Sequence, residues 1–267
     1  MRNLLISEYR KLVTTRMWWI LLIVMIAYMG FTAAAMAAIT TMPELSGQQG
    51  APAVSASDVP SIVYTTAASM GYVFPVIIGT LSFAAEFRHR TISTTYLGTP
   101  ARLRVLAAKL ISAIPMGLLY GIVGTGACVI LGGIVLEATG GEAMLASAAT
   151  WAIIIRSVLA ITLWLLVGVA LGSWLTNQAV AIVAILVFTQ FVEPLARMGL
   201  GATSWGADVS KFLPGAAGDS LAGGSFYSAL SPAGASLPAW LGAAVLIAYA
   251  LVFAGLGAAT TLRKDVN

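Results

Sequence analysis

Long apolar runs alternate with short polar stretches along this chain. Six runs are continuously apolar, and they cover roughly residues 18–39, 62–85, 105–136, 151–175, 179–192 and 237–262. A helix of about 20 apolar residues crosses a hydrocarbon core about 30 Å thick. The pattern therefore predicts an all-α, polytopic membrane protein with six transmembrane helices.

Two of these runs differ in length from a single crossing. The run 179–192 is short, so we expect its helix to continue through Glu193 and Pro194 toward Met198. The run 105–136 is longer than one crossing requires. We expect it to tilt, to kink near Pro115 or to protrude from the bilayer.

Two glycine pairs mark places where helices can approach closely. They are Gly117 with Gly121, and Gly168 with Gly172. Small residues four positions apart let neighbouring helices pack in lipid. Such contacts lie either within one subunit or at a subunit interface, and the sequence leaves both possibilities open.

The composition agrees with a membrane location. Hydrophobic residues make up 59% of the chain and charged residues only 9%, whereas soluble domains carry about 25% charged residues. So few charged side chains cannot cover the surface of a soluble protein of this size. The single cysteine, Cys128, lies in an apolar run, and we expect a small packed residue there rather than a metal ligand.

The basic residues are distributed unevenly between the two sides of the predicted topology. Eleven of the 14 lie in the N-terminus, the 86–104 stretch with nearby Lys109, and the C-terminal tail. The other three are Arg156, Arg197 and Lys211. Basic residues near span ends stay cytoplasmic. We therefore expect a multi-pass protein of the bacterial plasma (inner) membrane, with both termini and the 86–104 loop in the cytoplasm.

The first 17 residues predict a separate amphipathic helix. Its apolar face holds Leu5, Tyr9, Leu12 and Val13, and the charged residues away from that face are Glu8, Arg10 and Lys11. Such a helix lies in the membrane interface with its basic residues near anionic headgroups. The alternative is a plain positively charged flank of the first span.

Recognisable catalytic chemistry is absent from the sequence. The chain has no G-x-x-x-x-G-K-[ST] phosphate-binding loop, and its one histidine, His89, belongs to no cluster with metal-ligand spacing. The ionisable residues near the spans are Arg156, Glu193 and Arg197, all toward the outer ends, and we expect Glu193 and Arg197 to form a helical ion pair. We expect no enzyme activity, no cofactor and no metal site in this chain.

The stretch 86–104, EFRHRTISTTYLGTPARLR, is polar and basic between two apolar runs. It predicts a helix over 86–97 with Glu86 in the first turn, where the helix dipole favours an acid. Gly98 suits the position just after a helix, and Thr99 with Pro100 suits an N-cap followed by a first helical residue. The sequence therefore predicts a helix, a sharp break and a second helix. The alternative is that the arginines act only as a topology signal.

Three features resemble the membrane-spanning subunit of an ABC-2 type (type V) ABC transporter. The start, EYRKLVTTRMWWILL (8–22), is similar to the family's amphipathic connecting helix and first span. The stretch FAAEFRHRTISTTYLGTPARLRVLAAKL (83–110) is similar to the family's first cytoplasmic loop and coupling helix. The six-span layout, with a long outer segment before the last span, also matches.

This resemblance implies a permease subunit that works with other chains. ATP and Mg would bind a partner dimer of ABC ATPase subunits, and a second permease copy or paralogue would complete the complex. Membrane lipids are a further partner, and nucleic acid is not expected. Residues 1–17 would form the connecting helix and 18–267 the six-span domain, with an outer re-entrant segment at 199–236. The coupling helix would lie between spans 2 and 3, and the implied ATPase-coupling residues are Glu86, Phe87, Arg88, His89, Arg90, Ile92, Gly98, Thr99 and Pro100.

Aromatic residues and methionine in the first two spans suggest an adaptable apolar route for a substrate. The candidates are Tyr28, Phe31, Tyr64, Met70, Tyr72 and Phe74. The alternative is that these side chains only pack or face lipid.

Together these features favour a permease subunit of an ATP-driven exporter for an amphiphilic, drug-like or lipid-linked substrate, as in multidrug efflux. One alternative is a permease of the same fold that serves immunity or sensing. Another, from a different class, is a secondary carrier or an intramembrane enzyme. A gene for a phosphate-loop ATPase beside this one would separate the two permease hypotheses from the third.

Overall fold

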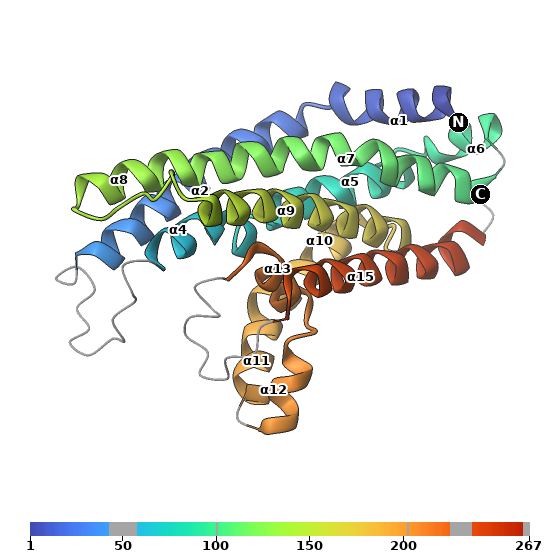
Figure 1. The fold of residues 1–267 in the computed structure, drawn as a ribbon. Helices are drawn as coiled ribbons and strands as arrows, with labels where there is room; N and C mark the ends of the chain where they lie inside the picture. Colours follow the sequence, from blue (N-terminus) through green and yellow to red (C-terminus); the bar gives the residue numbers. More distant parts are fainter. Residues whose placement is uncertain (43–57, 100, 202, 225–236, 264–267) are drawn as a thin grey trace.

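The computed structural model describes residues 1–42, 58–99, 101–201, 203–224 and 237–263, and within these ranges it contains helices and no strands (Figure 1). Six helical segments in these ranges are long and apolar enough to cross a membrane. They are Met17–Thr41, Val59–Arg88, Arg102–Ala138, Ala148–Trp174, Gln178–Gly201 and Ala239–Ala259. The prediction of an all-helical chain with six apolar spans is therefore confirmed.

Helix α9 (Ala148–Trp174) lies at the centre of the bundle. It packs against helices of the second, third and sixth spans. Glycines of the third span allow that span to lie close to α9. Gly117 faces Thr162 and Gly121 faces Val158, so an added methyl group at either glycine would meet α9. Gly168 and Gly172 of α9 lie in the same way against backbone atoms of the second span. Both predicted glycine pairs therefore make packing contacts within one chain.

The second span is not one continuous helix, contrary to the prediction of a single run over 62–85. It consists of α4 (Val59–Ser69) and α5 (Val73–Arg88). Residues 70–72 form a turn between them. Pro75 lies in the first turn of α5, where a residue without a backbone N–H is tolerated because that N–H would have no helical partner.

The third and fifth spans each contain a π-helical turn. The third runs through α7 (Arg102–Ala127), a π-turn (Cys128–Gly132) and α8 (Gly133–Ala138), and α7 continues through Pro115 without interruption. The fifth runs through α10 (Gln178–Val187), a π-turn (Phe188–Val192) and α11 (Glu193–Gly201). The predicted extension of the fifth span beyond Glu193 is confirmed. Single π-turns often accompany functional sites in helices.

The segment before the last span turns back into the bundle. After α11 come α12 (Ser204–Ser210) and α13 (Pro214–Ala222), and α15 (Ala239–Ala259) is the last span. Helices α11 and α12 project from the bundle, whereas α13 packs against α4, α9 and α15 (Figure 1). The predicted outer segment 199–236 is helical over its described part, and residues 202 and 225–236 of it lie outside the described residues.

One end of the bundle gathers α1 (Arg2–Thr14), α6 (Ile92–Gly98) and both ends of the chain (Figure 1). We call it the α6 end. The predicted continuous helix over 86–97 is wrong, because α5 ends at Arg88 and α6 begins only at Ile92. Between them Arg90 has a positive φ of 56°, a conformation that cannot continue a right-handed helix.

The predicted start of the following helix is also displaced. Gly98 is the last residue of α6 instead of the first residue after it. Thr99 is extended and follows α6, and the next helix, α7, begins at Arg102 after Ala101. Thr99 therefore does not cap α7, and Pro100 lies outside the described residues. The break between two helices is present, but its position and its capping differ from the prediction.

Candidate functional site

Four charged side chains from three separate elements meet at the α6 end. They are Glu8 and Lys11 of α1, Glu86 of α5 and Lys109 of α7, and we call them the α6-end cluster. The Lys109 Nζ atom lies 2.6 Å from a Glu8 carboxylate oxygen and 2.5 Å from Glu86 Oε1. Lys11 Nζ lies 2.6 Å from the other Glu8 oxygen and 3.1 Å from Glu86 Oε1. The cluster thus ties the N-terminal helix to the second and third spans.

The α6-end cluster is buried and balanced in charge. The side chains of Glu8 and Lys109 are only 2% and 3% exposed, whereas that of Lys11 is 40% exposed. Burying an unpaired charge is very costly, so two ammonium groups beside two carboxylates form a favourable arrangement only when all four are present. Removing Lys109 leaves two buried carboxylates without their buried cation, which makes this cluster sensitive to substitution at that position.

Further hydrogen bonds extend the cluster to α6. Lys109 Nζ donates to the Ser82 carbonyl oxygen at 3.0 Å. Lys11 Nζ donates to Thr95 Oγ1 at 3.1 Å, and the Thr95 hydroxyl donates to Glu86 Oε2 at 3.3 Å. Position and orientation of α6 are therefore coupled to α1 and to both spans.

Helix α1 has three faces instead of the predicted two. Glu8 faces the bundle together with the half-buried Leu5 and Leu12, so the prediction that Glu8 lies away from the apolar face is wrong. The burial of Glu8 depends on Lys109, which lies far away in the sequence. Tyr9 and Val13, which were predicted to lie with Leu5 and Leu12, form with Ile6 a separate exposed apolar stripe.

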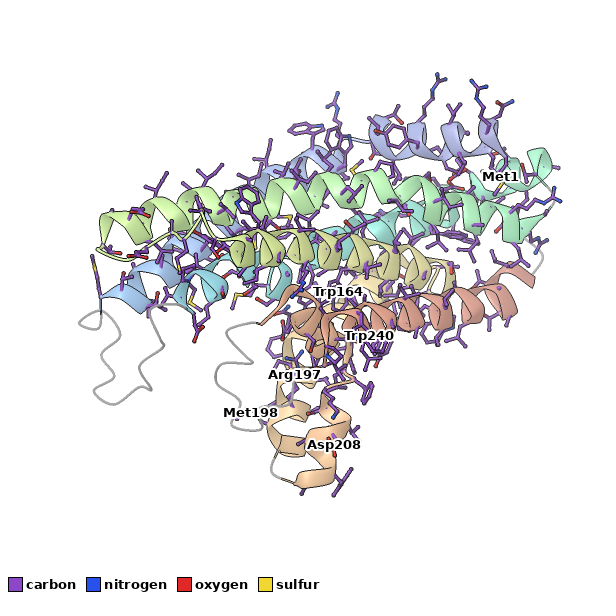
Figure 2. The ribbon with its side chains drawn as sticks, in the orientation of Figure 1. Met1, Trp164, Arg197, Met198, Asp208 and Trp240 are labelled. Carbon is purple, nitrogen blue, oxygen red and sulfur yellow. The ribbon has the colours of Figure 1, made fainter. Side chains whose placement is uncertain are left out.

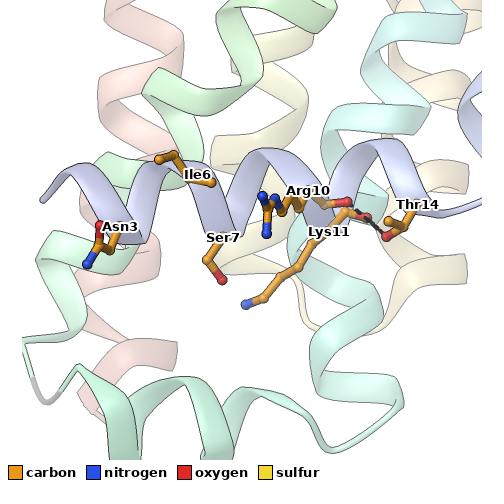
Figure 3. A pocket seen from close by; sticks show the side chains of 6 residues that line it. All are labelled: Asn3, Ile6, Ser7, Arg10, Lys11 and Thr14. Atoms are coloured by element: carbon orange, nitrogen blue, oxygen red, sulfur yellow. Dashed lines mark hydrogen bonds between the residues drawn. The ribbon is translucent and has the colours of Figure 1, made fainter.

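The third face of α1 is a polar stripe along a groove. The groove has a volume of about 490 Å³ and is lined by Asn3, Ser7, Arg10, Lys11 and Thr14 of this stripe and by Ile6 of the apolar stripe (Figure 3). In Figure 3 the Lys11 side chain extends away from α1, and its Nζ atom contacts Glu8 and Glu86 of the cluster. The polar stripe thus borders the α6-end cluster on the surface of the protein.

Lys11 and Tyr96, which lie at the α6 end outside the six spans, have shifted pKa values. Burial by itself lowers the pKa of Lys11, but the carboxylates of Glu8 and Glu86 outweigh it and raise the pKa above the ordinary value for lysine. Burial raises the pKa of Tyr96 to about 12. Lys11 therefore stays charged and Tyr96 stays neutral across the physiological pH range.

The surface of the α6 end differs from the predicted contact surface. Arg88, His89 and Arg90 are exposed, as a contact loop requires, and Phe87 is half-buried. Ile92 is fully buried, however, and Glu86 is engaged with Lys109 and Lys11 inside the chain. Neither can contact another protein in this conformation. Sequence reasoning assigned Glu86 to the surface because it could not identify the lysine that binds it.

The sequence reasoning did not predict that a leucine near the end of α6 is exposed. Leu97 is 84% exposed, and Leu103 at the start of α7 is also exposed. Large apolar side chains at the polar end of a bundle are unusual unless something covers them. Arg102 lies between these leucines in the sequence, and its guanidinium lies 5.2 Å from the centre of the Tyr96 ring. Arg102 Nη1 also donates to the Leu262 carbonyl oxygen at 2.5 Å, so it joins α6 to the end of the last span.

The predicted pathway residues do not share one surface. Tyr28 and Phe31 of α2 (Met17–Thr41) are exposed, and Tyr28 lies 6.1 Å from the ring of the half-buried Phe74. Tyr64 is fully buried, and its hydroxyl donates to the Ala143 carbonyl oxygen at 2.8 Å. Packing and this hydrogen bond explain why a tyrosine occupies position 64, and no substrate contact is needed for that.

The other two pathway candidates lie at the break in the second span. Met70 is half-buried, and Tyr72 is buried with its ring stacked on Trp164 at 4.4 Å between centres. The structure therefore brings Tyr72 and Trp164 together and separates them from the exposed pair on α2. Trp164 was not among the predicted residues, and its position in a long apolar run gave no signal of a role.

A second group of charges fixes α13, and we call it the α13 cluster. Arg197 Nη2 lies 2.5 Å from Glu193 Oε1, as the predicted ion pair requires, and Arg197 Nη1 lies 2.8 Å from Asp219 Oδ2. The backbone N–H groups of Gly215 and Ala216 donate to the Glu193 carboxylate at 3.0 and 2.9 Å. These N–H groups belong to the first turn of α13, where a negative charge is favoured. The sequence did not identify Asp219 as a partner of Arg197, because the two residues meet only when α13 folds back into the bundle.

The described residues contain no group of three or more histidine, cysteine, aspartate or glutamate side chains arranged to hold a metal ion. Cys128 is buried and free, in agreement with its predicted packing role. In the described part of the chain, the ion pairs that join separate elements lie in the α6-end cluster and the α13 cluster.

No protein-family model matches this chain, and no curated protein matches its sequence. Function must therefore be inferred from the arrangement of the six spans and of these two clusters.

Proposed function

We propose that the chain is the permease subunit of an ATP-driven ABC exporter in a bacterial plasma membrane. It would move an amphiphilic, drug-like or lipid-linked substrate, and a separate ATPase subunit would supply the energy. The α6 end would face the cytoplasm, as the basic residues there predict. The resemblance to ABC-2 permeases motivates this proposal, and the surface of the α6 end gives it a physical basis.

The observation that carries the proposal is that one short segment, residues 88–97, exposes Leu97 and three basic residues, Arg88, His89 and Arg90. Interfaces combine a central apolar anchor with a polar rim. Leu97 would be the anchor of an ATPase contact, with the basic residues binding acidic groups on the partner. This assignment replaces Phe87 and Ile92 as the main apolar anchors, because they are more buried.

The α6-end cluster would transmit a push on α6 into the membrane. Thr95 of α6 is hydrogen-bonded to Lys11 and Glu86, and Lys109 connects the same cluster to α7. Charge pairs that are buried together resist separation, since each separated charge would need a new partner. Helices α1, α6 and α7 would therefore move together instead of bending at a loose linker.

A second permease copy would bind against the exposed apolar helices. The first, fifth and sixth spans are less buried within this chain than the second span, and the projecting α11–α12 hairpin exposes apolar side chains. Its most exposed ones include Leu195, Met198 and Trp205. Lipid or a second copy can cover such surfaces. A dimer would also bring two copies of Tyr28 and Phe31 toward a shared pathway.

A proton-coupled carrier is the competing function, and the α13 cluster is the observation that favours it. Glu193 and Asp219 are both buried in the apolar part of the molecule. Carboxylates in such places often serve proton or ion movement. The ion pairs with Arg197 and the hydrogen bonds from the N–H groups of α13 explain the burial of both acids by a structural role instead.

The test uses everted membrane vesicles that contain this chain and its ATPase, with rhodamine 6G as the transported amphiphile. We expect uptake to require ATP and to persist after a protonophore abolishes the proton gradient. Leu97→Ala should reduce uptake by about tenfold or more, because loss of a central apolar anchor weakens an interface strongly.

Leu145→Ala is the matched control, because Leu145 is also an exposed leucine but lies between α8 and α9. Its uptake should equal that of the wild type at equal expression. Uptake that ignores ATP and collapses with the proton gradient would instead identify a carrier. Normal uptake and ATPase binding by Leu97→Ala would exclude α6 as the contact.

A further inference from the structure

Trp164 presents a hydrogen-bond donor that nothing in the described part of the protein uses. Among the described residues it is the largest fully buried side chain, at 0% exposure, and its indole N–H has no hydrogen-bond acceptor there. A buried donor without a partner carries the full cost of losing water. Such a group in the centre of a bundle calls for an explanation other than packing, since phenylalanine would pack without that cost.

The indole nitrogen points at the re-entrant helix α13. A methyl group added at Gly218 would lie 2.8 Å from Trp164 Nε1, so only the lack of a side chain lets α13 approach this close. The indole ring stacks on Tyr72, at an angle of 18° between the ring planes. Gln190 Nε2 donates to the Tyr72 hydroxyl at 3.0 Å. Trp164, Tyr72 and Gln190 thus form a small aromatic and polar group beneath α13, which we call the Trp164 group.

Three irregularities of the helices converge on this group. Tyr72 lies in the turn that separates α4 from α5, and Gln190 lies in the π-turn of the fifth span. Gly218 belongs to α13, which enters the bundle without crossing it. Interrupted helices and re-entrant segments at membrane depth occur where backbone and side chains line a binding site. Figure 2 marks Trp164 and Arg197 in this part of the molecule.

We propose that the Trp164 group is a binding site for the substrate, covered by α13 in the present conformation. The Trp164 N–H would donate to a carbonyl, ester or ether oxygen of an amphiphile whose apolar body lies among the surrounding helices. The carboxylates of the nearby α13 cluster disfavour an anionic ligand, so the ligand is neutral or cationic. Withdrawal of α13 exposes the site. The inference rests on the proposed function for the direction of transport, but not for binding itself.

The experiment measures binding without any ATPase. The purified chain in lipid nanodiscs is titrated with rhodamine 6G, a cationic amphiphile with an ester and an aromatic ether oxygen, and fluorescence anisotropy reports the affinity. Carboxyfluorescein, an anion with a similar ring system, serves as the contrasting probe. The variant is Trp164→Phe, which keeps an aromatic ring and removes the N–H donor together with part of the indole.

We expect Trp164→Phe to bind rhodamine 6G about tenfold more weakly, the loss typical of one hydrogen bond. Its melting temperature should fall only slightly, because the smaller ring leaves some empty space but the lost N–H has no partner to lose. Carboxyfluorescein should bind neither protein. Trp240→Phe is the matched control, since Trp240 is 70% exposed at the start of α15, and it should change neither property.

Three results would overturn the inference. A wild type that does not bind rhodamine 6G has no site of this class. Equal affinity in Trp164→Phe means that the N–H does not contact the ligand. Binding of carboxyfluorescein as tight as that of rhodamine 6G means that the carboxylates of the α13 cluster do not select the ligand. Because the assay contains no ATPase, each result is independent of whether transport is driven by ATP.

Discussion

The α6-end cluster and the α13 cluster are both buried groups of charged side chains. They differ in net charge and in how many elements of the fold they join. The α6-end cluster has two amines and two carboxylates and joins α1, α5 and α7. The α13 cluster has one guanidinium for two carboxylates, and backbone N–H groups of α13 support Glu193. The first connects distant elements of the bundle, whereas the second holds one short helix in place.

This difference predicts different consequences of damage. Loss of a charge from the α6-end cluster affects three elements at once and should lower the stability of the whole bundle. Loss of a charge from the α13 cluster should release α13 while the six spans stay folded, because local opening can occur well below the global free energy of unfolding. A rigid α6 end and a releasable α13 are what a protein needs if it receives force at one place and opens at another.

The largest effect is expected for Lys109→Met. The variant leaves Glu8 and Glu86 buried without their central cation, and breaking a buried ion pair on one side costs about 3–5 kcal/mol. The free energy of unfolding in mixed micelles should fall by that amount. The control is Lys211→Met, whose partner Asp208 is 73% exposed, and an exposed pair contributes about 0–1 kcal/mol. Equal losses in the two variants would contradict the central role of Lys109.

A smaller and more local effect is expected for Glu193→Ala. The variant removes the acceptor of the Gly215 and Ala216 N–H groups and one partner of Arg197, so α13 should detach more often. The reporter is Ser220→Cys, buried on α13, in a Cys128→Ala background, and we expect a thiol reagent to label it about tenfold or more faster.

The matched control for this experiment is Glu142→Ala, an exposed acid between α8 and α9, which should leave the labelling rate unchanged. The melting temperature of Glu193→Ala should fall by less than that of Lys109→Met. Unchanged labelling would mean that packing against α9 and α15 alone holds α13.

The smallest effect is expected for Lys11→Met, together with a weak pH dependence. The Lys11 side chain is 40% exposed, so water partly replaces its contribution, and we expect a loss of about 1 kcal/mol. Because the folded state raises the pKa of Lys11, its contribution is fully present below the unfolded pKa of about 10.4 and is lost as the pH rises through the folded value. The stability difference between Lys11→Met and the wild type should therefore be constant from pH 6 to 9. A difference that changes within that window would show that another group controls the cluster.

The sequence was sufficient for features that depend on neighbouring residues. Six apolar runs gave the six spans because the length of a crossing is set by the bilayer. Glu193 and Arg197 were predicted as a pair because a spacing of four places them on one helix face. The same rule could have paired Glu8 with Lys11, three positions along α1. It could not find Lys109, which belongs to α7, or bring Lys11 to Glu86 of α5.

Irregular backbone was the other limit of sequence reasoning. In the apolar run around Met70, Gly71 in the turn and Pro75 a few residues later are the signals of the break between α4 and α5. The π-turns at Cys128–Gly132 and Phe188–Val192 have no composition signal at all, because packing against other helices selects them. The return of α13 placed Asp219 beside Arg197 and Gly218 beside Trp164. A glycine-rich segment reveals the capacity for close approach but not its partner.

The bond between Lys109 and Glu8 also has a consequence for biosynthesis. The two residues are separated by 101 positions, so a ribosome that adds about 5–20 residues per second needs roughly 5–20 s to supply the lysine after the glutamate. Throughout that interval Glu8 has Lys11 beside it but lacks Lys109, the cation with which it is buried in the finished bundle. We expect the helix to wait at the membrane surface, with Tyr9 and Val13 toward lipid, until the third span is inserted. Mutations that delay insertion of the third span would then expose α1 to proteases of quality control, even if they change nothing in the finished molecule.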